Sequence, residues 1–295
     1  MQTQFLYEYD FAVLFHSLIR QIPVWIRQET QDQALRRTRI KSLLRSVVYR
    51  ALYLFVNKGF YIGELNRQHF LRHGIAASRL IRAPYCTTDR FKNVTDAQFA
   101  RIRDACRAKL EVREDRIVIG FFGKLIPKKN PDLLLQAIPF LPEDLKRKGV
   151  ALFVGSGVLE PEIKAHARRL EQFGIQCVFT GFINQSAIRD YYAATDILVL
   201  PSNREGETWG LVVNEGLHAG CSIIMSNAVG CHREFGDWER VRVIAEGDAQ
   251  GLAAAIADLH RFSPQRRWAT DLIAAYSVEA AAQAIAQAIT EISPS

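Results

Sequence analysis

Two glutamates and the residues between them form the most distinctive chemical pattern in the chain. Glu207 and Glu215 lie in PSNREGETWGLVVNEGLHAG (201–220), with seven residues between them. A helix beginning near Thr208 to Gly210 would point free backbone N–H groups and the positive end of its dipole at an anion. Glu215 would then lie about two turns along, roughly 12 Å from Glu207 by helical rise. This spacing favours a long ligand, with polyol groups at both ends and phosphates between them, over two ordinary surface charges.

Basic and glycine residues follow two predicted strands upstream. Lys124 and Lys129 follow the apolar run RIVIGFF (116–122), and their ammonium groups could hold a diphosphate. Considered alone, this segment is better explained as a solvated basic loop. Gly155 and Gly157 follow the next apolar run, where glycine lets a backbone approach a ligand closely, although a tight turn explains them equally well. Both segments are candidate binding loops because ligands of open α/β sheets bind outside the carboxyl ends of the strands.

Apolar runs that alternate with helical patterns predict an α/β fold. Six runs in the second part of the chain predict the buried strands of a doubly wound parallel sheet. They lie at 116–122, 150–155, 176–179, 196–200, 221–225 and 241–244. In the first part, strands are predicted at 11–15, 23–26, 59–62 and 79–84, and helices at 32–54 and 64–72. We therefore expect a complete Rossmann-like second domain and a partial Rossmann-like first domain.

A turn-rich stretch at 85–94 divides these two parts. We expect a partial first domain over residues 1–92, a Rossmann-like domain over 93–276 and a C-terminal helix over 277–295 that packs back on the first domain. The first domain begins abruptly and has fewer strands than a doubly wound domain usually has. The expectation is that its opening βα units are missing from this chain.

Cysteine content and hydropathy limit the class of protein. The five cysteines are scattered, odd in number and without a CxxC pair. This favours reduced thiols in a cytoplasm over a disulfide framework or a zinc site. The first residues, MQTQFLYEYD, are polar and acidic and do not resemble a signal peptide. The most apolar stretch, 47–63, is too short and too charged to span a bilayer.

Basic residues are concentrated in the first part. Residues 1–115 carry 20 Lys+Arg and 11 Asp+Glu, a net charge of +9. Residues 116–295 carry 18 and 20, a net of −2, and the two sum to +7. A basic helix pattern over 33–50 has two interpretations of equal weight, a solvated surface face or peripheral contact with an anionic membrane. Nucleic-acid binding is not expected, because no aromatic-interleaved basic motif or recognition helix is present.

Six sequence blocks follow one another in order along residues 123–234, and this order is more specific than any single block. They are G-[RK]-L with a later lysine (Gly123, Lys124, Leu125, Lys129), V-G-x-G (Val154 to Gly157), V-x-F-x-G (echoed by Cys177 to Gly181), Y-x-x-A-D to L-P-S (Tyr191, Ala194, Asp196, Leu200, Pro201, Ser202, with Thr195 inserted before Asp196), E-x7-E (Glu207, Glu215) and S-x3-G with a later glutamate (Ser226, Gly230, Glu234). In this order the blocks resemble the retaining GT-B glycosyltransferases of family 4, the group 1 family. Lys124 stands where arginine is commoner in that family, which keeps the charge but loses bidentate geometry.

The resemblance implies transfer of a hexose, with retention, from a UDP- or GDP-sugar to a polysaccharide, lipid-linked or other glycan acceptor. Lys124 and Lys129 would contact the donor diphosphate. Glu207 would bind the donor sugar and Glu215 the ribose hydroxyls. The other implied donor-binding residues are Gly123, Gly155, Gly157, Phe182, Ile183, Gly210, Leu211 and Val212.

The resemblance also implies that no metal is required, since lysines and a helix end would carry the charge of the leaving group. No DxD-like motif has a credible strand-end context. In this family the leaving phosphate is thought to help deprotonate the acceptor, which attacks on the same face. The expected location is the cytoplasm, with peripheral contact at the inner face of the cell membrane as an open alternative.

The first part resembles the second half of the family's acceptor domain. IPVWIRQETQD (22–32) matches the strand and loop after which many members place a histidine near the donor sugar. Glu29 occupies that region and is our candidate catalytic residue there, with His16 as the weaker candidate. We expect that the family's opening strands and glycine-rich loop are missing from this chain, which leaves truncation, a start downstream of the true start or a partner polypeptide open. The alternatives are a non-catalytic nucleotide-sugar-binding module, a subunit of a split glycosyltransferase, or a nucleotide-sugar epimerase whose catalytic acids we do not locate.

Overall fold

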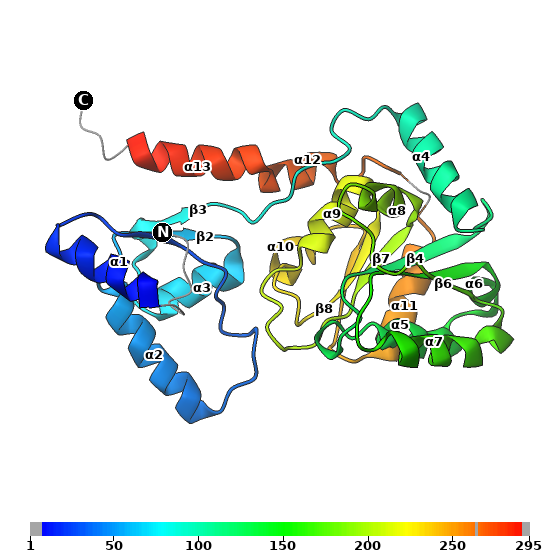
Figure 1. Cartoon of the computed structure of the whole chain (residues 1–295), viewed down its shortest axis with the longest axis horizontal. Helices are drawn as coiled ribbons and strands as arrows, with labels where there is room; N and C mark the ends of the chain where they lie inside the picture. The colour runs from blue at the N-terminus through cyan, green and yellow to red at the C-terminus, as the bar shows by residue number, and fades with distance from the viewer. Residues whose placement is uncertain (1–7, 263–264, 291–295) are drawn as a thin grey trace. The chain divides into compact units, whose positions relative to one another are not determined.

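The computed structural model describes residues 8–262 and 265–290 of the chain. Residue contacts divide the chain into two compact units (Figure 1). The first consists of residues 1–86 together with 275–295, and the second of residues 87–274. Each unit is built around one parallel sheet flanked by helices, so the fold class is α/β, as expected.

The first unit contains a three-stranded parallel sheet in the order β1-β2-β3. Its elements are α1 (Glu8–Ile19), β1 (Trp25–Arg27), α2 (Arg39–Tyr53), β2 (Lys58–Tyr61), α3 (Glu64–Arg72), β3 (Leu80–Arg82) and α13 (Val278–Thr290). On one face, Ile26 of β1 packs with Tyr53 of α2 and Phe70 of α3. On the other face, Phe60 of β2 packs with Ala288 of α13. The C-terminal helix is therefore part of the core of the first unit.

One helical stretch within the described residues, Thr270–Thr290, is long and apolar enough by length and composition to cross a membrane. It contains α12 (Thr270–Ile273), a 3-10 turn and α13. Because Ala288 of α13 is buried in the core of the first unit, we interpret α13 as a packing helix. The helix predicted at 277–292 is found over Val278–Thr290, and the last residues of the predicted C-terminal segment, 291–295, lie outside the described residues.

Two expectations for the first unit are wrong. The strand predicted at 11–15 lies inside helix α1. A short apolar run such as FAVLF is consistent with a strand or with a helix segment, and periodicity alone does not distinguish them. The helix predicted over 32–54 begins only at Arg39, where the Thr38 side chain accepts a hydrogen bond from the Lys41 backbone N–H. Arg36 and Arg37 therefore precede the helix.

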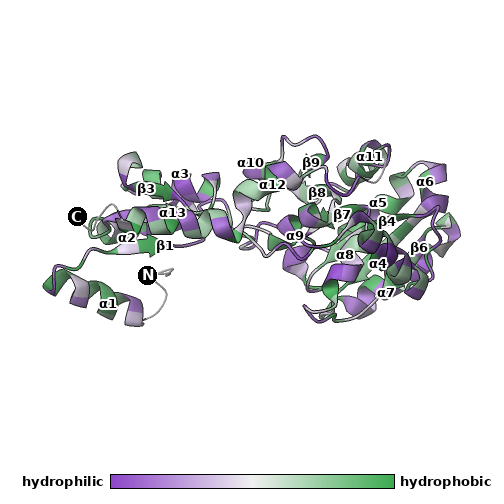
Figure 2. Cartoon of the chain, turned by 90° about the horizontal axis from the view of Figure 1, so that it is seen from above, coloured by the Kyte–Doolittle hydropathy of each residue, from purple (hydrophilic) through white to green (hydrophobic). Residues whose placement is uncertain are grey.

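The second unit contains a six-stranded parallel sheet in the order β6-β5-β4-β7-β8-β9. All six strands predicted from the sequence are confirmed. They are β4 (Ile117–Phe122), β5 (Gly149–Val154), β6 (Gln176–Phe179), β7 (Ile197–Leu200), β8 (Ser222–Ser226) and β9 (Val241–Ile244). Figure 2 shows apolar residues concentrated along these strands. Strand order reverses between β4 and β7, and in such sheets the crevice outside the carboxyl ends at this point binds ligands.

Helices cover both faces of the larger sheet (Figure 1). They are α4 (Asp96–Lys109), α5 (Asp132–Ala137), α6 (Glu143–Lys148), α7 (Glu160–Arg169), α8 (Ile188–Ala194), α9 (Leu211–Ala219), α10 (His232–Phe235), α11 (Ala249–Leu259) and α12. Helices α5, α7 and α11 pack on one face, around residues such as Phe121 of β4. The next residue, Phe122, faces the opposite way and stacks on Tyr192 of α8, with ring centroids 4.1 Å apart.

Candidate functional site

Lys129 and Glu207 are in contact at the end of the larger sheet, where the strand order reverses. Lys129 ends a short 3-10 turn after β4, and Glu207 lies in the loop after β7. The Lys129 Nζ forms an ion pair with Glu207 Oε2. The Ser202 hydroxyl donates to the same carboxylate oxygen at 3.1 Å. The Glu207 side chain is only 9% exposed, so two donors stabilise a carboxylate that is largely removed from water.

Further hydrogen bonds join the two loops that carry this pair. The Asn203 backbone N–H donates to the Lys128 carbonyl at 2.8 Å, and the Asn203 amide donates to the Pro127 carbonyl at 2.9 Å. The Lys128 ammonium group donates to the Gly206 carbonyl at 2.8 Å. Lys128 therefore ties one loop to the other, whereas its neighbour Lys129 is directed at a carboxylate.

Helix α9 begins directly after the second of these loops, at Leu211. Its N-cap is Gly210, which has a φ of +103° and no side chain to cap the helix. The Val213 N–H donates to the Gly210 carbonyl at 2.9 Å. The N–H groups of Leu211 and Val212 belong to the first turn of the helix, where intrahelical acceptors are missing. A helix terminus of this kind can bind an anion, and this one lies a few residues after Glu207.

The loop after β8 packs closely against the start of α9. A Cβ atom on Gly230 would lie 1.7 Å from the Thr208 carbonyl oxygen. The Cys231 N–H donates to the Trp209 carbonyl at 3.0 Å. The Trp209 indole is buried and donates to Asn214 Oδ1 at 2.8 Å. The glycine of the S-x3-G block is therefore required for two backbones to meet, and this contact positions the residues just before α9.

Glu215 lies half-buried on α9 and accepts a hydrogen bond from the Tyr192 hydroxyl. Tyr192 is on α8 and is 1% exposed. Burial raises the pKa of Tyr192 well above its usual value, and the Glu215 carboxylate raises it further. The phenol therefore stays protonated and acts as the donor. The sequence analysis did not identify Tyr192, because nothing local marks a contact between two helices.

The glycine loops after β4 and β5 pack against each other. A Cβ atom on Gly155 would lie 2.0 Å from the Gly123 carbonyl oxygen. A Cβ atom on Gly157 would lie 2.4 Å from the Leu125 carbonyl oxygen. Both glycines are thus required by this backbone contact, whether or not a ligand also approaches them.

Lys124 and Phe182 lie in loops at the carboxyl ends of two strands of the larger sheet, β4 and β6. Lys124 follows β4 and has an exposed side chain, and no contact among the described residues joins it to the ion pair above. Phe182 follows β6, and its side chain is 77% exposed. The adjacent Ile183 is partly buried. The Gly181 carbonyl accepts a hydrogen bond from the Gly155 N–H at 3.0 Å, which ties this loop to the glycine loops.

Glu29 lies in the first unit, after β1, where it accepts a hydrogen bond from the Tyr85 hydroxyl. The Arg27 guanidinium lies 5.6 Å from the centre of the Tyr85 ring and donates to the Pro84 carbonyl at 3.3 Å. Burial raises the pKa of Tyr85, and the Glu29 carboxylate raises it further. The expectation that His16 ends a strand is wrong, because His16 is an exposed residue of helix α1.

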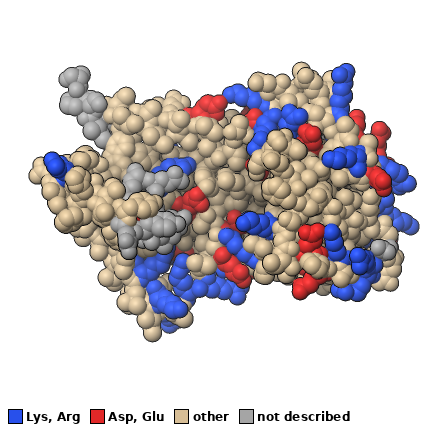
Figure 3. Space-filling view, viewed as in Figure 1, with Lys and Arg blue, Asp and Glu red and all other residues tan. Residues whose placement is uncertain are grey.

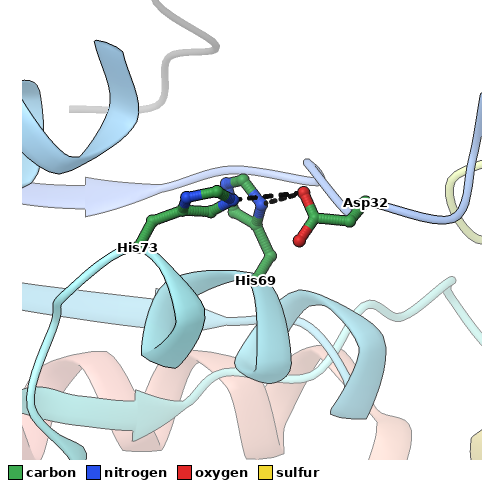
Figure 4. A group of neighbouring side chains, drawn as sticks. All are labelled: Asp32, His69 and His73. Atoms are coloured by element: carbon green, nitrogen blue, oxygen red, sulfur yellow. Dashed lines mark hydrogen bonds and ion pairs between the residues drawn. The ribbon is translucent and has the colours of Figure 1, made fainter. Parts of the chain in front are cut away.

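Asp32, His69 and His73 form a cluster in the first unit that the sequence analysis did not identify (Figure 4). Asp32 Oδ1 lies 2.8 Å from His69 Nδ1 and 3.2 Å from His73 Nε2. Arg45 Nη1 is 2.7 Å from the same carboxylate oxygen, and Arg72 Nη1 is 3.1 Å from the other. The H-x3-H spacing of the two histidines is the one sequence signal for this cluster.

The potential ligand atoms of the three residues lie within 4.8 Å of one another, a spacing that a metal ion could use. Two guanidinium groups already balance the charge of Asp32, however. The second ring nitrogens are also engaged, since His69 Nε2 is 2.9 Å from the Tyr53 hydroxyl and His73 Nδ1 is 3.2 Å from the Ser46 hydroxyl. We therefore interpret the cluster as a hydrogen-bond network that joins α2, α3 and the loop after β1.

A cavity of about 410 Å³ lies at the opposite, amino-terminal end of the larger sheet, with Arg103, Asp196 and Arg240 in its lining. Asp196 accepts hydrogen bonds from Arg103 and Arg107, each at 2.6 Å, and from the Val118 backbone N–H at 2.8 Å. Asp196 of the Y-x-x-A-D block therefore ties α4 to the sheet. We do not assign a donor to this cavity, because ligands of such sheets bind at the carboxyl ends.

Comparison with known proteins agrees with the sequence blocks. The model of the family described as Glycosyl transferases group 1 matches residues 102–269. A D-inositol 3-phosphate glycosyltransferase of Catenulispora acidiphila is 32% identical over 165 residues, which cover 52% of this chain and 38% of that protein. The corresponding protein of Streptomyces avermitilis is 28% identical over 215 residues, 70% of this chain and 43% of that one.

Solved glycosyltransferase structures resemble the chain in fold. HepE from Anabaena, crystallised with UDP, superposes with a TM-score of 0.73 at 18% identity, covering 95% of this chain and 75% of that one. WaaG, a glycosyltransferase involved in lipopolysaccharide biosynthesis, gives a TM-score of 0.60 at 18% identity, covering 90% and 77%. At these identities the likeness shows the fold alone, which is of the GT-B type.

The chain spans about two fifths of the length of the curated relatives described above. The segment matched by the family model, residues 102–269, makes up more than half of the chain. It includes both lysine positions, the loop with Glu207 and all of α9. The chain therefore belongs to the group 1 glycosyltransferases.

Proposed function

We propose that the second unit binds a nucleoside-diphosphate sugar and that the whole protein transfers this sugar to a glycan acceptor with retention of configuration. The observation that carries the proposal is the Lys129–Glu207 ion pair beside the N-terminus of α9. It combines a cation, a largely buried carboxylate and free backbone N–H groups at the switch point of the sheet. A sugar diphosphate needs these groups, because it carries anionic phosphates next to neutral hydroxyls.

The diphosphate would be held by Lys129, Lys124 and the first N–H groups of α9. A helix N-terminus stabilises anionic phosphate through its dipole and its unpaired N–H groups. Lys129 is fixed by its contact with Glu207, whereas the exposed Lys124 is free to reach a ligand on its flexible stem. The glycine loops after β4 and β5 present backbone rather than side chain at this edge of the sheet.

The neutral ends of the donor would be held by the two glutamates. Glu207 would accept hydrogen bonds from sugar hydroxyls, and Glu215, positioned by Tyr192, from the ribose hydroxyls. Phe182 and Ile183 would border the base, since Phe182 offers an exposed aromatic face.

Donor binding would redistribute the ion pair. Lys129 and Ser202 both donate to Glu207 Oε2. An incoming diphosphate would attract Lys129 and leave Glu207 with lone pairs for sugar hydroxyls. The ammonium groups and the helix end would also stabilise the leaving diphosphate, so we propose that no metal is required. Attack by the acceptor on the same face of the sugar would give retention, with the leaving phosphate accepting the acceptor's proton.

The donor and the compartment are proposed from the HepE structures and from the cysteines. HepE was crystallised with UDP and with UDP-glucose, which favours a UDP-hexose as the first donor to test. We propose a polysaccharide or lipid-linked glycan as acceptor and the cytoplasm as the compartment, since each of the five cysteines is a free thiol. Glu29 remains our candidate catalytic residue in the first unit.

A second candidate function is donor binding without catalysis, either alone or as a subunit of a split glycosyltransferase. The observation that favours it is the location of every assigned donor-binding residue in the second unit, where the family match also lies. Such a module would bind a nucleotide sugar but transfer nothing by itself.

Transfer of radiolabelled sugar to extracted lipids and glycans separates these functions. The purified chain is incubated with labelled UDP- or GDP-sugars and extract, with and without EDTA. A labelled product that resists EDTA and is lost in the Glu207→Ala variant supports the transferase without a metal. Tight donor binding without a product supports the binding module. Absence of donor binding contradicts both.

A further inference from the structure

The outward face of α2 is apolar. Its exposed hydrophobic residues follow the 3-4 spacing that places side chains on one side of a helix. They are Ile40, Leu43, Leu44, Val47 and Val48, whose side chains are between 55% and 73% exposed. Leu54, directly after the helix, is 78% exposed. We call the five helical residues the outward stripe.

The polar and aromatic side of α2 faces the core instead. Arg45 is paired with Asp32, Ser46 with His73, and Tyr53 with His69. A surface helix of a globular protein normally buries its apolar side and exposes its polar side. Helix α2 has the opposite arrangement, with its polar side in the hydrogen-bond network around Asp32 and its apolar side exposed. A contiguous exposed apolar stripe of this kind indicates an interaction surface.

The charged residues that lie near the outward stripe in sequence are all basic. No Asp or Glu occurs between Asp32 and Glu64, whereas this segment contains seven basic residues. They are Arg36, Arg37, Arg39, Lys41, Arg45, Arg50 and Lys58. Arg39, Lys41 and Arg50 lie on α2 itself and are exposed. Figure 3 shows Lys and Arg side chains gathered on the part of the first unit where α2 begins.

We propose that α2 docks the protein onto a bilayer that contains anionic phospholipid. The outward stripe would lie at the boundary between headgroups and acyl chains, with Arg39, Lys41 and Arg50 among the phosphates. The helix, about 22 Å long by helical rise, would lie in the plane of the interface. Charge complementarity selects this occupant, because a second copy of the same face would bring two sets of cationic side chains together. The proposal does not rest on the donor site.

Vesicle co-sedimentation of the full chain tests the proposal. Vesicles of phosphatidylcholine with about one third phosphatidylglycerol, an anionic lipid, are compared with pure phosphatidylcholine vesicles at low and high salt. The chain should bind the anionic vesicles, and binding should weaken as salt rises. Neutralising Arg39, Lys41 and Arg50 together to glutamine should weaken binding about a hundredfold, on the scale of roughly fivefold per basic residue.

Leu43→Ser with Val47→Ser tests the apolar part of the surface. Both side chains are exposed, so the fold should persist, which far-UV circular dichroism checks. Vesicle binding should fall at least about tenfold, since two buried aliphatic side chains are lost from the interface. The matched control is Leu272→Ser on α12, an exposed leucine in the second unit that should leave vesicle binding unchanged.

A Leu44→Trp variant measures depth directly. Brominated lipids should quench the fluorescence of this variant more than that of the parent chain. The extra quenching should disappear when Leu43→Ser and Val47→Ser are added. Vesicle binding that is absent in the parent chain or unaffected by the serine variant overturns the proposal. So does sedimentation of the free chain as a dimer that the serine variant converts to a monomer, which would assign the stripe to self-association.

The Glu207→Ala variant should bind vesicles as the parent does. Failure of the proposed donor site can therefore be distinguished from failure of the proposed membrane contact.

Discussion

The Lys129 ammonium group contacts the Glu207 carboxylate although the two residues are 78 positions apart in sequence. The contact exists because β4 and β7 are neighbours in the sheet, so the loops at their carboxyl ends meet. Asn203 and Lys128 then tie these loops together. The reversal of strand order between β4 and β7 thus brings a cation and a carboxylate together just before α9.

Loss of Glu207 should abolish sugar transfer. Glu207→Ala removes the proposed acceptor for sugar hydroxyls, and a loss of at least about a hundredfold in kcat/KM is expected for such a group. Thermal unfolding should show that the fold is intact. Glu205→Ala is the matched control, because Glu205 is an exposed glutamate in the same loop. Full transfer activity in the Glu207 variant would remove this residue from the site.

Loss of Glu215 should weaken nucleotide binding rather than transfer at saturation. Glu215→Ala removes the proposed partner of the ribose hydroxyls, which should raise the Kd for UDP about tenfold or more. Tyr192→Phe keeps the carboxylate but removes its positioning hydrogen bond, so its Kd should lie between those of the parent and Glu215→Ala. Isothermal titration measures both, and an unchanged Kd for Glu215→Ala would contradict the ribose role.

Gly230 should not tolerate alanine. A Cβ atom there would lie 1.7 Å from the Thr208 carbonyl oxygen, so the segment before α9 would have to move. Gly230→Ala should lower the Tm and weaken donor binding together. The control is Gly247→Ala, where φ is +77° but no atom lies within 4 Å of the added Cβ. That variant should show only the cost of left-handed backbone, about 1–2 kcal/mol. Equal Tm values for the two variants would count against the close approach.

Acid should destabilise the chain through His69. Burial lowers the pKa of His69 to about 4, although the hydrogen bond to Asp32 partly opposes this. The unfolded imidazole keeps a pKa near 6.5, so the unfolded state binds more protons between these values. The free energy of unfolding should therefore fall as pH drops from about 6.5 to 4, by up to about 3 kcal/mol.

Asp32 extends this loss to lower pH. Burial alone would raise the pKa of Asp32, but hydrogen bonds from His69 and His73 lower it below its ordinary value. The ionised Asp32 therefore stabilises the folded state above about pH 4, and this stabilisation is lost as the pH falls below that value. Arg45 and Tyr53 also face this network. Urea unfolding measures the free energy of unfolding at pH 7 and pH 4.5 for the parent and for His69→Gln. The control is His260→Gln, because His260 is exposed. A pH dependence that is unchanged in His69→Gln would contradict the assignment.

Much of the second unit was predictable because its signals are local. Buried parallel strands read as continuous apolar runs, and all six were found where expected. The sequence also predicted a helix that begins near Thr208 to Gly210. Helix α9 begins at Leu211, with Gly210 as its N-cap. The contact between Lys129 and Glu207 follows from one topological rule, that ligand-binding loops gather at the carboxyl ends of neighbouring strands. Their binding of a donor stays a prediction.

The first unit was less predictable because its decisive contacts are not local. FAVLF is too short for periodicity to separate a strand from a helix, and it lies within α1. The network around Asp32 joins that residue to His73, 41 positions later, which no local pattern reveals. The side of α2 that faces inward is the one that joins this network, so the sequence showed a basic helix but not which side would face outward.

Titration of the chain with UDP, measured by calorimetry, tests the central claim most directly. The parent chain should bind UDP, and Lys129→Ala should weaken that binding at least about tenfold through loss of a charge-assisted contact. The control is Lys148→Ala, because Lys148 is an exposed lysine at the end of α6. This variant should bind UDP as the parent does. Equal UDP affinity in the parent and Lys129→Ala, with both correctly folded, would contradict a phosphate site at this end of the sheet.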